Sequence, residues 1–334
     1  MIKIIEKAKN EHILTKEEIV GLLKEVDSSL LLKAADDVRK KYVGDEIHLR
    51  ALIEFSNICR SDCFYCGLRA SNNKISRYRF TKDDILLCVA SAVELGFKTV
   101  VLQSGEDLYF SADYLAEIIS EIKKFDIAVT LGIGERTTNE YKKLKEAGAD
   151  RFLLRIETTD KQLYEKLHPN MSYENRLRCL YDLKKLGFET GTGCLVGLPH
   201  QPLDSLADDI LFFKELDADM VGIGPLIVHP DTPLKNCANG SFELSLKVMA
   251  ITRLLLPDIN IPATTAMETL HSNGRMIALQ SGANVIMPNF TLASCQKKYE
   301  IYPNKNNESD LKQIYSKITS IGRTISTTKG FRLN

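Results

Sequence analysis

The 334-residue chain lacks several features that would assign it to a class at once. Its 44 basic residues are balanced by 44 acidic ones, so no overall field favours nucleic acid or an anionic membrane as a partner. No run approaches about 18 uncharged apolar residues, which argues against a membrane span. The first nine residues, MIKIIEKAK, lack the apolar centre of a signal peptide, so we expect a cytoplasmic protein. Tryptophan is also absent, which excludes nothing.

Three of the eight cysteines are clustered, with the spacing C-x3-C-x2-C at Cys59, Cys63 and Cys66. A random scatter of eight cysteines would give this triplet with a probability of roughly 0.004. A cluster of this kind in a chain of this length favours reduced thiols at a metal site over a disulfide framework.

Three kinds of metal site could use these thiols. Structural zinc needs four closed ligands, and the nearest outside candidates, His48 and Cys88, show no paired spacing. A ferredoxin-type electron carrier would also use four thiolates. A [4Fe–4S] cluster held by three thiolates leaves one iron open to a chelating ligand, as the open position of a catalytic metal site does. We favour the third kind, and keep a non-catalytic iron–sulfur or zinc protein as an alternative class.

From about residue 47 onward, short apolar runs alternate with amphipathic stretches. We expect strands near 47–55, 98–103, 127–133, 151–157, 189–196, 219–224, 259–264 and 283–287. We expect helices near 81–95, 112–124, 138–147, 172–187, 202–216 and 243–256, with Gly96, Gly148, Gly187 and Gly282 at or near helix ends. Eight strands alternating with helices predict an α/β fold, a (β/α)8 TIM-type barrel.

The barrel is expected to span residues 47–303. Residues 1–46 are predicted to form an N-terminal helical extension, in which Thr15 and Glu18 make a capping-box pattern. Residues 304–334 are predicted to be a C-terminal tail, packed on the barrel and containing one helix near 308–324.

Polar residues at the carboxyl ends of the strands should converge with the cysteine loop, because barrel active sites lie at that face. Gln103, Ser104, Gly105 and Glu106 follow the second predicted strand. Glycine there permits a close backbone approach, and a carboxylate can accept hydrogen bonds from an ammonium group. Late in the chain, the adjacent Thr264 and Thr265 offer hydroxyl and backbone N–H groups to an anion.

The fourth predicted strand carries two charges, Arg155 and Glu157, which alternation would place on one face. Isolated buried charges are too costly, so the pair must be matched internally or bound to a ligand. One interpretation is a structural ion pair. The other makes Glu157 a ribose or substrate partner and Arg155 a carboxylate clamp. By contrast, we expect Cys179 and Cys194 to be packed in the core.

The cysteine spacing, with an aromatic residue before the last cysteine, resembles the radical S-adenosylmethionine (SAM) superfamily. In that superfamily SAM binds the fourth iron of a [4Fe–4S] cluster, and the reduced cluster cleaves it to methionine and a 5′-deoxyadenosyl radical. The resemblance implies that Cys59, Cys63 and Cys66 hold the cluster and that Tyr65 lies beside the adenine. Ser104, Gly105 and Glu106 would bind the SAM amino group, and Arg176 its carboxylate.

Further motifs narrow the resemblance to the HydE family of [FeFe]-hydrogenase maturases. They are Ile53–Asn57, Val101–Asp107, Val196–Pro199, Val221–Pro225, His229–Leu234, Ile261–Met267 and Asn284–Asn289. The resemblance implies radical chemistry on a small precursor containing sulfur and iron, with HydG and HydF as partner maturases and a flavodoxin or ferredoxin as reductant. It implies further SAM contacts at Gln103, Thr130, Arg155, Glu157 and Met220, and substrate or anion contacts at Thr264, Thr265 and Tyr299.

Two departures from the family pattern matter. No cysteine follows Cys295, so we expect a single cluster and not the second, C-terminal cluster of some members. Ile156 stands where well-known members are expected to have histidine, which changes the local polarity. A radical SAM mutase or sulfur-inserting enzyme of the methylornithine synthase or biotin synthase type is therefore kept as the second interpretation.

Overall fold

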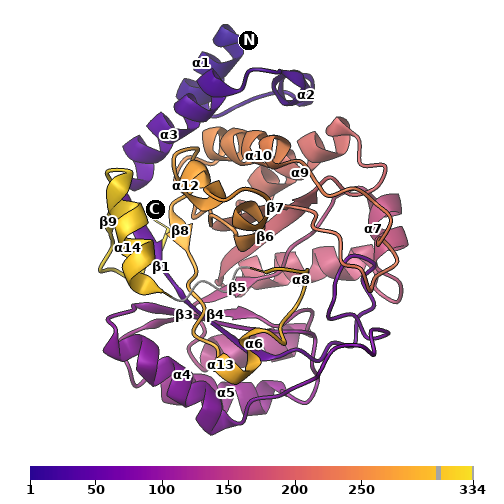
Figure 1. Cartoon of the computed structure of the whole chain (residues 1–334), viewed down its shortest axis with the longest axis vertical. Coiled ribbons are helices and arrows are strands. Elements are labelled where there is room, and N and C mark those ends of the chain that lie inside the picture. Colours follow the sequence, from indigo (N-terminus) through magenta and orange to yellow (C-terminus); the bar gives the residue numbers. More distant parts are fainter. Residues whose placement is uncertain (306–309, 333–334) are drawn as a thin grey trace.

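The computed structural model describes residues 1–305 and 310–332, and its centre is a parallel sheet of six strands (Figure 1). The described residues form these strands in both sheets: β1 (Glu46–Leu49), β2 (Ala51–Ser56), β3 (Thr99–Ser104), β4 (Ala128–Gly132), β5 (Arg151–Leu153), β6 (Glu189–Val196), β7 (Met220–Pro225), β8 (Val285–Ile286) and β9 (Thr324–Ile325). Strands β2 to β7 pair in chain order, each parallel to the next. A second sheet, ordered β8-β1-β9, is joined to the first through the consecutive strands β1 and β2.

Backbone hydrogen bonds continue round the barrel beyond β7. Asn260 bridges to Met220 of β7, and Pro262 bridges to Val285 of β8, each in parallel. Strand β8 then pairs with β1, with His48 opposite Val285. The sheet therefore closes on itself, and the predicted α/β barrel is confirmed.

Three predicted strands differ from the observed ones. The first, 47–55, divides at Arg50, because β1 pairs with β8 and β9 while β2 pairs with β3. The seventh, 259–264, makes only isolated bridges, and Pro262 in its middle has no N–H to donate to a ladder. The fourth, 151–157, is regular only over β5, because Glu157 takes a left-handed φ of 67°. Strict alternation therefore does not govern Arg155 and Glu157.

Helices surround the sheet and carry the connections between strands. They are α4 (Lys82–Glu94), α5 (Ala112–Ile122), α6 (Thr138–Glu146), α7 (Lys161–Leu167), α8 (Tyr173–Lys185), α9 (Leu203–Glu215), α10 (Phe242–Leu255), α11 (Thr265–Leu270), α12 (Gly274–Leu279) and α13 (Ala293–Gln296). The six predicted helices are present as α4, α5, α6, α8, α9 and α10. Helices α7, α11, α12 and α13 were not predicted, and each is too short for apolar periodicity to reveal it.

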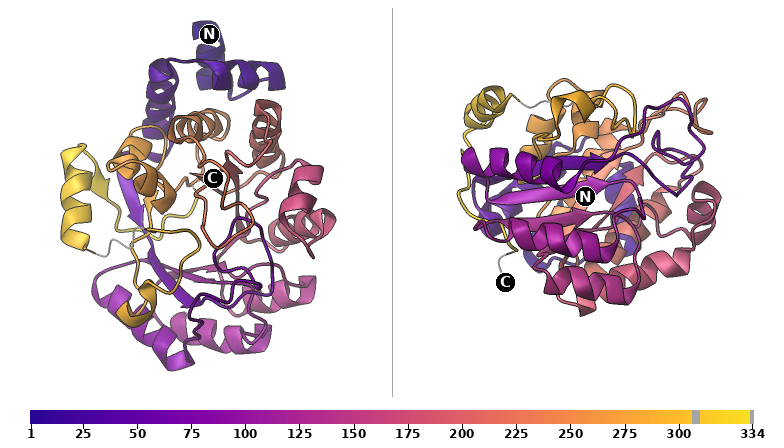
Figure 2. Two further views of the ribbon diagram at one scale, coloured as in Figure 1. Left: turned by 45° about the vertical axis from the view of Figure 1, so that its right-hand side comes forward. Right: turned by 90° about the horizontal axis from the view of Figure 1, so that it is seen from below.

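The N-terminal extension consists of α1 (Ile2–Glu11), α2 (Lys16–Lys24) and α3 (Ser29–Val43), which stand together at one end of the molecule (Figures 1 and 2). The predicted capping box is present, since Thr15 Oγ1 accepts from Glu18 N and Glu18 accepts from Thr15 N. Helix α3 packs on α10, and α2 packs on α9. Lys16 Nζ lies 2.7 Å from Asp208 Oδ2 of α9, which fixes this contact.

The C-terminal segment packs against the barrel at two places. The predicted helix near 308–324 is α14 (Leu311–Ser320), and residues 308 and 309 of that prediction lie outside the described residues. Strand β9 then pairs with β1. Residues 329–332 lie against the amino-terminal ends of the strands, where the Lys329 carbonyl accepts from Thr99 and Arg151.

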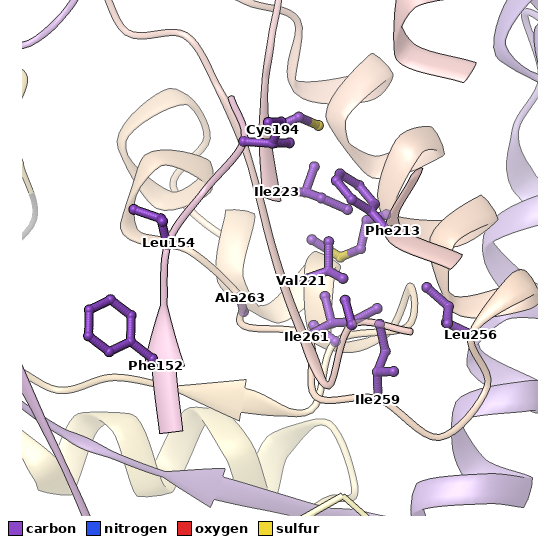
Figure 3. Close-up of a cluster of buried hydrophobic side chains, with 14 of the residues drawn as sticks. Phe152, Leu154, Cys194, Phe213, Val221, Ile223, Leu256, Ile259, Ile261 and Ala263 are labelled. Atoms are coloured by element: carbon purple, nitrogen blue, oxygen red, sulfur yellow. The ribbon is translucent and has the colours of Figure 1, made fainter. Parts of the chain in front are cut away.

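The apolar core lies between the strands and the outer helices. Figure 3 shows Val221 and Ile223 of β7 beside Phe213 of α9, with Ile259 and Ile261 close by. Cys179 and Cys194 are fully buried in this core, as expected. Every helix in the described part of the chain is too short or too polar to cross a membrane.

Candidate active site

The three clustered cysteines lie on a long loop between β2 and α4, and polar contacts within the loop fix its path. Asn57 Nδ2 donates to the carbonyls of Ser76 (2.8 Å) and Lys298 (2.7 Å), while its Oδ1 accepts from Tyr78 N at 2.7 Å. The Arg77 guanidinium donates to four loop carbonyls, those of Asn57, Leu68, Arg69 and Asn72. The side chains of Asn57 and Arg77 thus bond the loop's backbone groups, which in a helix or strand would bond one another.

The environment of the cysteines opposes free thiolates. Burial, together with negative charge on Cys59, raises the pKa of Cys66 to about 12. Burial, followed by the charges of Cys66 and Cys59, raises the pKa of Cys63 well above its usual range. Thiolates so close together and so poorly solvated are stable only when a cationic centre binds them, because a metal deprotonates the thiols that it coordinates.

The loop after β3 touches the cysteine loop directly. The Glu106 N–H donates to Cys59 Sγ at 3.3 Å. A Cβ on Gly105 would lie 2.3 Å from the Ile58 carbonyl oxygen and 2.8 Å from Cys59 Cβ, so only glycine allows this approach. The Glu106 carboxylate accepts from Arg60 Nε at 3.0 Å and from Glu135 N at 2.9 Å. This carboxylate is 9% exposed and lines the cavity described next.

A cavity of about 360 Å³ opens at the carboxyl ends of the strands. Most of the predicted site residues line it, namely Cys59, Cys63, Tyr65, Cys66, Gln103, Ser104, Gly105, Glu106, Arg155, Glu157, Arg176, Thr264, Thr265 and Tyr299. Thr130 and Met220 are outside this lining. Thr130 is buried at the middle of β4, and Met220 Sδ accepts from Arg50 Nη1 at 2.8 Å. Residues from most of the barrel strands therefore meet in one chamber.

Arginines and carboxylates are paired along one wall of the cavity. Arg155 Nη2 lies 3.2 Å from Glu157 Oε2, and also donates to the Cys194 carbonyl. Arg176 is 6% exposed, and its Nε donates to Glu135 Oε1 at 2.7 Å. Arg155 and Glu157 form the ion pair of the first interpretation and also line the cavity as the second requires. The two interpretations are therefore compatible.

Another part of the lining carries hydroxyl groups. Tyr302 and Thr265 share a hydrogen bond between Oη and Oγ1, and Gln103 Nε2 donates to Tyr299 Oη at 3.3 Å. Thr264 faces Gly224, where an added Cβ would lie 3.3 Å from Thr264 Oγ1. These groups can orient a small polar or anionic ligand between the barrel mouth and the cysteines.

Sequence reasoning missed a buried ion pair inside the cavity, between Glu54 of β2 and Lys305. The two side chains are 0% and 5% exposed, and Asn289 Nδ2 also donates to Glu54 at 3.0 Å. Burial raises the pKa of Glu54, and Lys305 opposes that rise. A carboxylate within the apolar run Ala51–Ser56 was the available signal, the same one that singled out Arg155 and Glu157.

Comparison with known proteins gives the family. The profile of the Radical SAM superfamily matches residues 53–213, and that of the Biotin and Thiamin Synthesis associated domain matches residues 221–317. The chain is 58% identical to the [FeFe] hydrogenase maturase subunit HydE of Thermotoga maritima over 275 residues, which cover 82% of this chain and 79% of that protein. The chain belongs to the radical SAM superfamily, in the HydE family.

More distant radical SAM enzymes share the fold of this HydE-family chain. It is 28% identical to the 3-methylornithine synthase of Methanosarcina acetivorans over 91% of this chain and 87% of that enzyme. The crystal structure of methylornithine synthase, PylB, superposes with a TM-score of 0.84 at 25% identity, over 97% of both chains. The maturase HydG superposes with a TM-score of 0.84 at 23% identity, over 98% of this chain and 76% of that one.

The cofactors of this radical SAM enzyme are a [4Fe–4S] cluster and SAM. The donor set fits them, because three thiols share one loop and one cavity, and a backbone N–H already points at one sulfur. When bound, the cluster and SAM together supply a 5′-deoxyadenosyl radical. The chain's own part is to hold these groups, orient a substrate and exclude water.

Proposed function

We propose that this chain acts in the assembly of the [FeFe]-hydrogenase active-site cluster, on a small precursor containing sulfur and iron. The observation that carries the proposal is the 58% identity to a HydE maturase, which covers most of both chains. The cavity supports it, because thiols, hydroxyls and three arginines line one small chamber that suits an anionic ligand.

The proposed roles are those that the family resemblance implies, and the position of the residues in one cavity supports them. Cys59, Cys63 and Cys66 hold the cluster, while Glu106 accepts from the amino group of SAM. Arg176, held in place by Glu135, faces the carboxylate of SAM, and Tyr65 lies beside its adenine. Gln103, Ser104, Gly105 and Glu157 complete the proposed cofactor contacts, whereas Thr130 and Met220 lie outside the cavity lining.

Arg155 is a further proposed SAM contact, whose guanidinium can present donors to an anionic group at the cavity wall. On the substrate side, Thr264, Thr265 and Tyr299 of the lining offer hydroxyls. The strand ends that carry these groups surround the cavity, so a reactive intermediate inside would be kept from solvent.

The partners are proposed on the same grounds. We infer a cysteine-type iron–sulfur small molecule as substrate, a flavodoxin or ferredoxin as reductant, and HydG- and HydF-type maturases before and after this step. The proposed location is the cytoplasm, with neither nucleic acid nor membrane as a partner.

A second candidate function is that of a mutase or sulfur-inserting enzyme. It is favoured by the superposition on PylB, which covers 97% of both chains. Relatives of this kind are less than about one-third identical to the chain, so we rank this function second.

Anaerobic reconstitution tests the enzyme class. The wild type should gain four irons, and its reduced cluster should change its EPR spectrum when SAM is added. It should form 5′-deoxyadenosine with dithionite. Cys63→Ala should lose both properties, while Cys237→Ala, at an exposed cysteine outside the cavity, should keep them.

Complementation separates the two functions. Expression in a host lacking its HydE activity should restore hydrogenase maturation in the wild type but not in Cys63→Ala. Failure of the wild type there, together with turnover of lysine or dethiobiotin in vitro, would reverse the ranking.

A further inference from the structure

We propose that His168, which follows α7, is a positioning residue for Tyr65. Tyr65 stands between Cys63 and Cys66 in the sequence, and His168 fixes its side chain and links it to Arg176. The inference rests on the proposed function, because it assigns Tyr65 and Arg176 to opposite parts of one SAM molecule. None of the sequence motifs that we considered includes His168.

The hydrogen bonds at His168 fix both its tautomer and the hydroxyl of Tyr65. His168 Nδ1 lies 2.7 Å from the Tyr164 carbonyl oxygen, and Nε2 lies 2.7 Å from Tyr65 Oη. Burial lowers the pKa of His168 to about 3, so the ring is neutral; because a carbonyl oxygen can only accept, Nδ1 carries the proton and Nε2 is the acceptor. The Tyr65 hydroxyl must then donate to Nε2. Each polar atom in this series of hydrogen bonds therefore has one role, either donor or acceptor. The Tyr65 ring is thereby held in a single orientation.

The same imidazole is part of an aromatic stack that reaches Arg176. The ring of His168 stacks on Tyr164 with centroids 4.1 Å apart and an interplanar angle of 25°. The ring of Tyr65 meets His168 edge-on at 5.4 Å, and the guanidinium carbon of Arg176 lies 5.7 Å from the Tyr164 centroid. Four side chains from three parts of the chain are thus in series, from the cysteine loop to α8.

The end of α7 also holds the backbone of the cysteine loop. Phe64 N donates to the Leu167 carbonyl at 2.9 Å, and Met171 Sδ lies 4.0 Å from Cys63 Sγ. Phe64 and Tyr65 pack on a separate apolar cluster that consists of Leu163, Leu167, Leu195, Leu198, Leu226 and Leu234. The segment around His168 therefore contacts the loop through backbone, aromatic and apolar contacts together.

A purely structural histidine would give the same burial, since His168 is 1% exposed and both its nitrogens are bonded. A structural role and a positioning role of His168 differ in whether SAM binding depends on the hydrogen bond from the Tyr65 hydroxyl. A structural role predicts that His168 and Tyr65 variants lose stability independently. A positioning role predicts that their effects on SAM binding are coupled, because both act through one hydrogen bond.

The test is a double-mutant cycle on the reconstituted full chain with Tyr65→Phe, His168→Leu and the double variant. His168→Gln is added because its amide oxygen can still accept from Tyr65. The measurements are the SAM dissociation constant and the EPR g-values of the reduced cluster with SAM. Iron content and melting temperature are controls for cluster loading and folding.

We expect each single variant to weaken SAM binding about tenfold, with shifted g-values and a full iron content. The double variant should bind no worse than either single variant, and His168→Gln should recover most of the affinity. Independent effects that multiply to about 100-fold, or wild-type SAM binding by His168→Leu or Tyr65→Phe, would overturn the proposal.

Tyr65→Phe removes only a hydroxyl, so it keeps the test decisive even if His168→Leu does not fold. A wild type that binds SAM but fails complementation would refute the proposed function alone.

Discussion

At the scale of single residues, the site depends on a backbone position where a side chain would collide with Glu106, which lines the cavity. Gly134, after β4, has a φ of 77°, and a Cβ added there would lie 2.0 Å from Glu106 Cγ. The Glu106 carboxylate is already fixed by Arg60 Nε and Glu135 N. It could not give way without losing the geometry proposed for the SAM amino group.

Gly134→Ala should therefore weaken SAM binding by at least about tenfold, because Glu106 has to move. Gly96→Ala is a matched control, since Gly96 also has a positive φ, 83°, but no atom lies within 4 Å of its added Cβ. Both variants should lose roughly 1–2 kcal/mol of stability from the left-handed backbone. Titration with SAM and thermal unfolding of both proteins check this, and equal SAM affinities would contradict it.

A second residue-scale effect concerns Asp209, a fully buried carboxylate on α9. Its Oδ1 accepts from Thr159 N (2.6 Å) and Thr159 Oγ1 (2.7 Å), and its Oδ2 makes no hydrogen bond within the described part of the chain. Burial raises its pKa from 3.8 to about 7. The folded protein thus holds a proton that the unfolded chain releases between about pH 4 and pH 7.

Stability should therefore fall as pH rises through that window, by up to about 1.4 kcal/mol per pH unit from this group, and then level off. Asp209→Asn removes the titration and keeps an oxygen that can accept from Thr159. Its stability relative to the wild type should rise from pH 5 to pH 7 and stay constant above pH 7.5. Melting temperatures of both proteins over this range test the sign, and parallel profiles would refute it.

At the scale of elements, short irregular pieces position the site, while long regular ones form the scaffold. Loops carry much of the cavity's polar lining, including the three clustered cysteines, Glu106 and Glu157, and the short α11 begins at Thr265 of the lining. The long outer helices and α1–α3 mostly supply apolar packing. Their ends are set by local chemistry, as the Thr15–Glu18 capping box of α2 shows.

Thr15→Ala should remove the cap of α2 and cost about 1 kcal/mol locally. Amide hydrogen exchange across Lys16–Lys24 should then become roughly fivefold faster. Ser28→Ala is the control, because Ser28 precedes α3 without a side-chain cap bond. It should leave exchange in α3 within about twofold of the wild type. Unchanged exchange in α2 would mean that packing on α9 alone holds that helix.

At the scale of the whole molecule, residues 329–332 close the amino-terminal end of the barrel. The Gly330 carbonyl accepts from Arg50 and Asn260, while the Arg332 guanidinium bonds Asp217, Asp219 and Asp258. Arg332 is 12% exposed at its side chain. Chain segments separated by most of the sequence are therefore connected at the end of the barrel opposite the cysteine loop.

Arg332→Ala should lower stability by roughly 1–3 kcal/mol, because Asp258 loses its cation and Asp217 and Asp219 are left with Lys184 alone. Lys329→Ala is the matched control, since its partner Asp126 is 85% exposed and such surface pairs contribute about 0–1 kcal/mol. Denaturation of the two variants under identical conditions measures the difference. A loss in Lys329→Ala as large as that in Arg332→Ala would contradict this account.

The sequence determined what local patterns can encode. Alternating apolar runs and amphipathic helices predicted the barrel, and Thr15 and the glycines predicted helix ends that the structure confirms. The C-x3-C-x2-C spacing indicated the cofactor class, because all three ligands lie within eight residues. These features depend on neighbours along the chain, so one sequence is enough to predict them.

Only the tertiary structure decided which distant side chains meet. The pairs Glu54–Lys305, Arg176–Glu135 and Tyr65–His168 each join residues at least 41 positions apart, and no periodicity relates their members. The break at Arg50 likewise arises from pairing with other strands. Contacts between distant parts of the chain decide which buried charges pair and which strands pair. The sequence therefore identifies the charged groups but does not predict their partners.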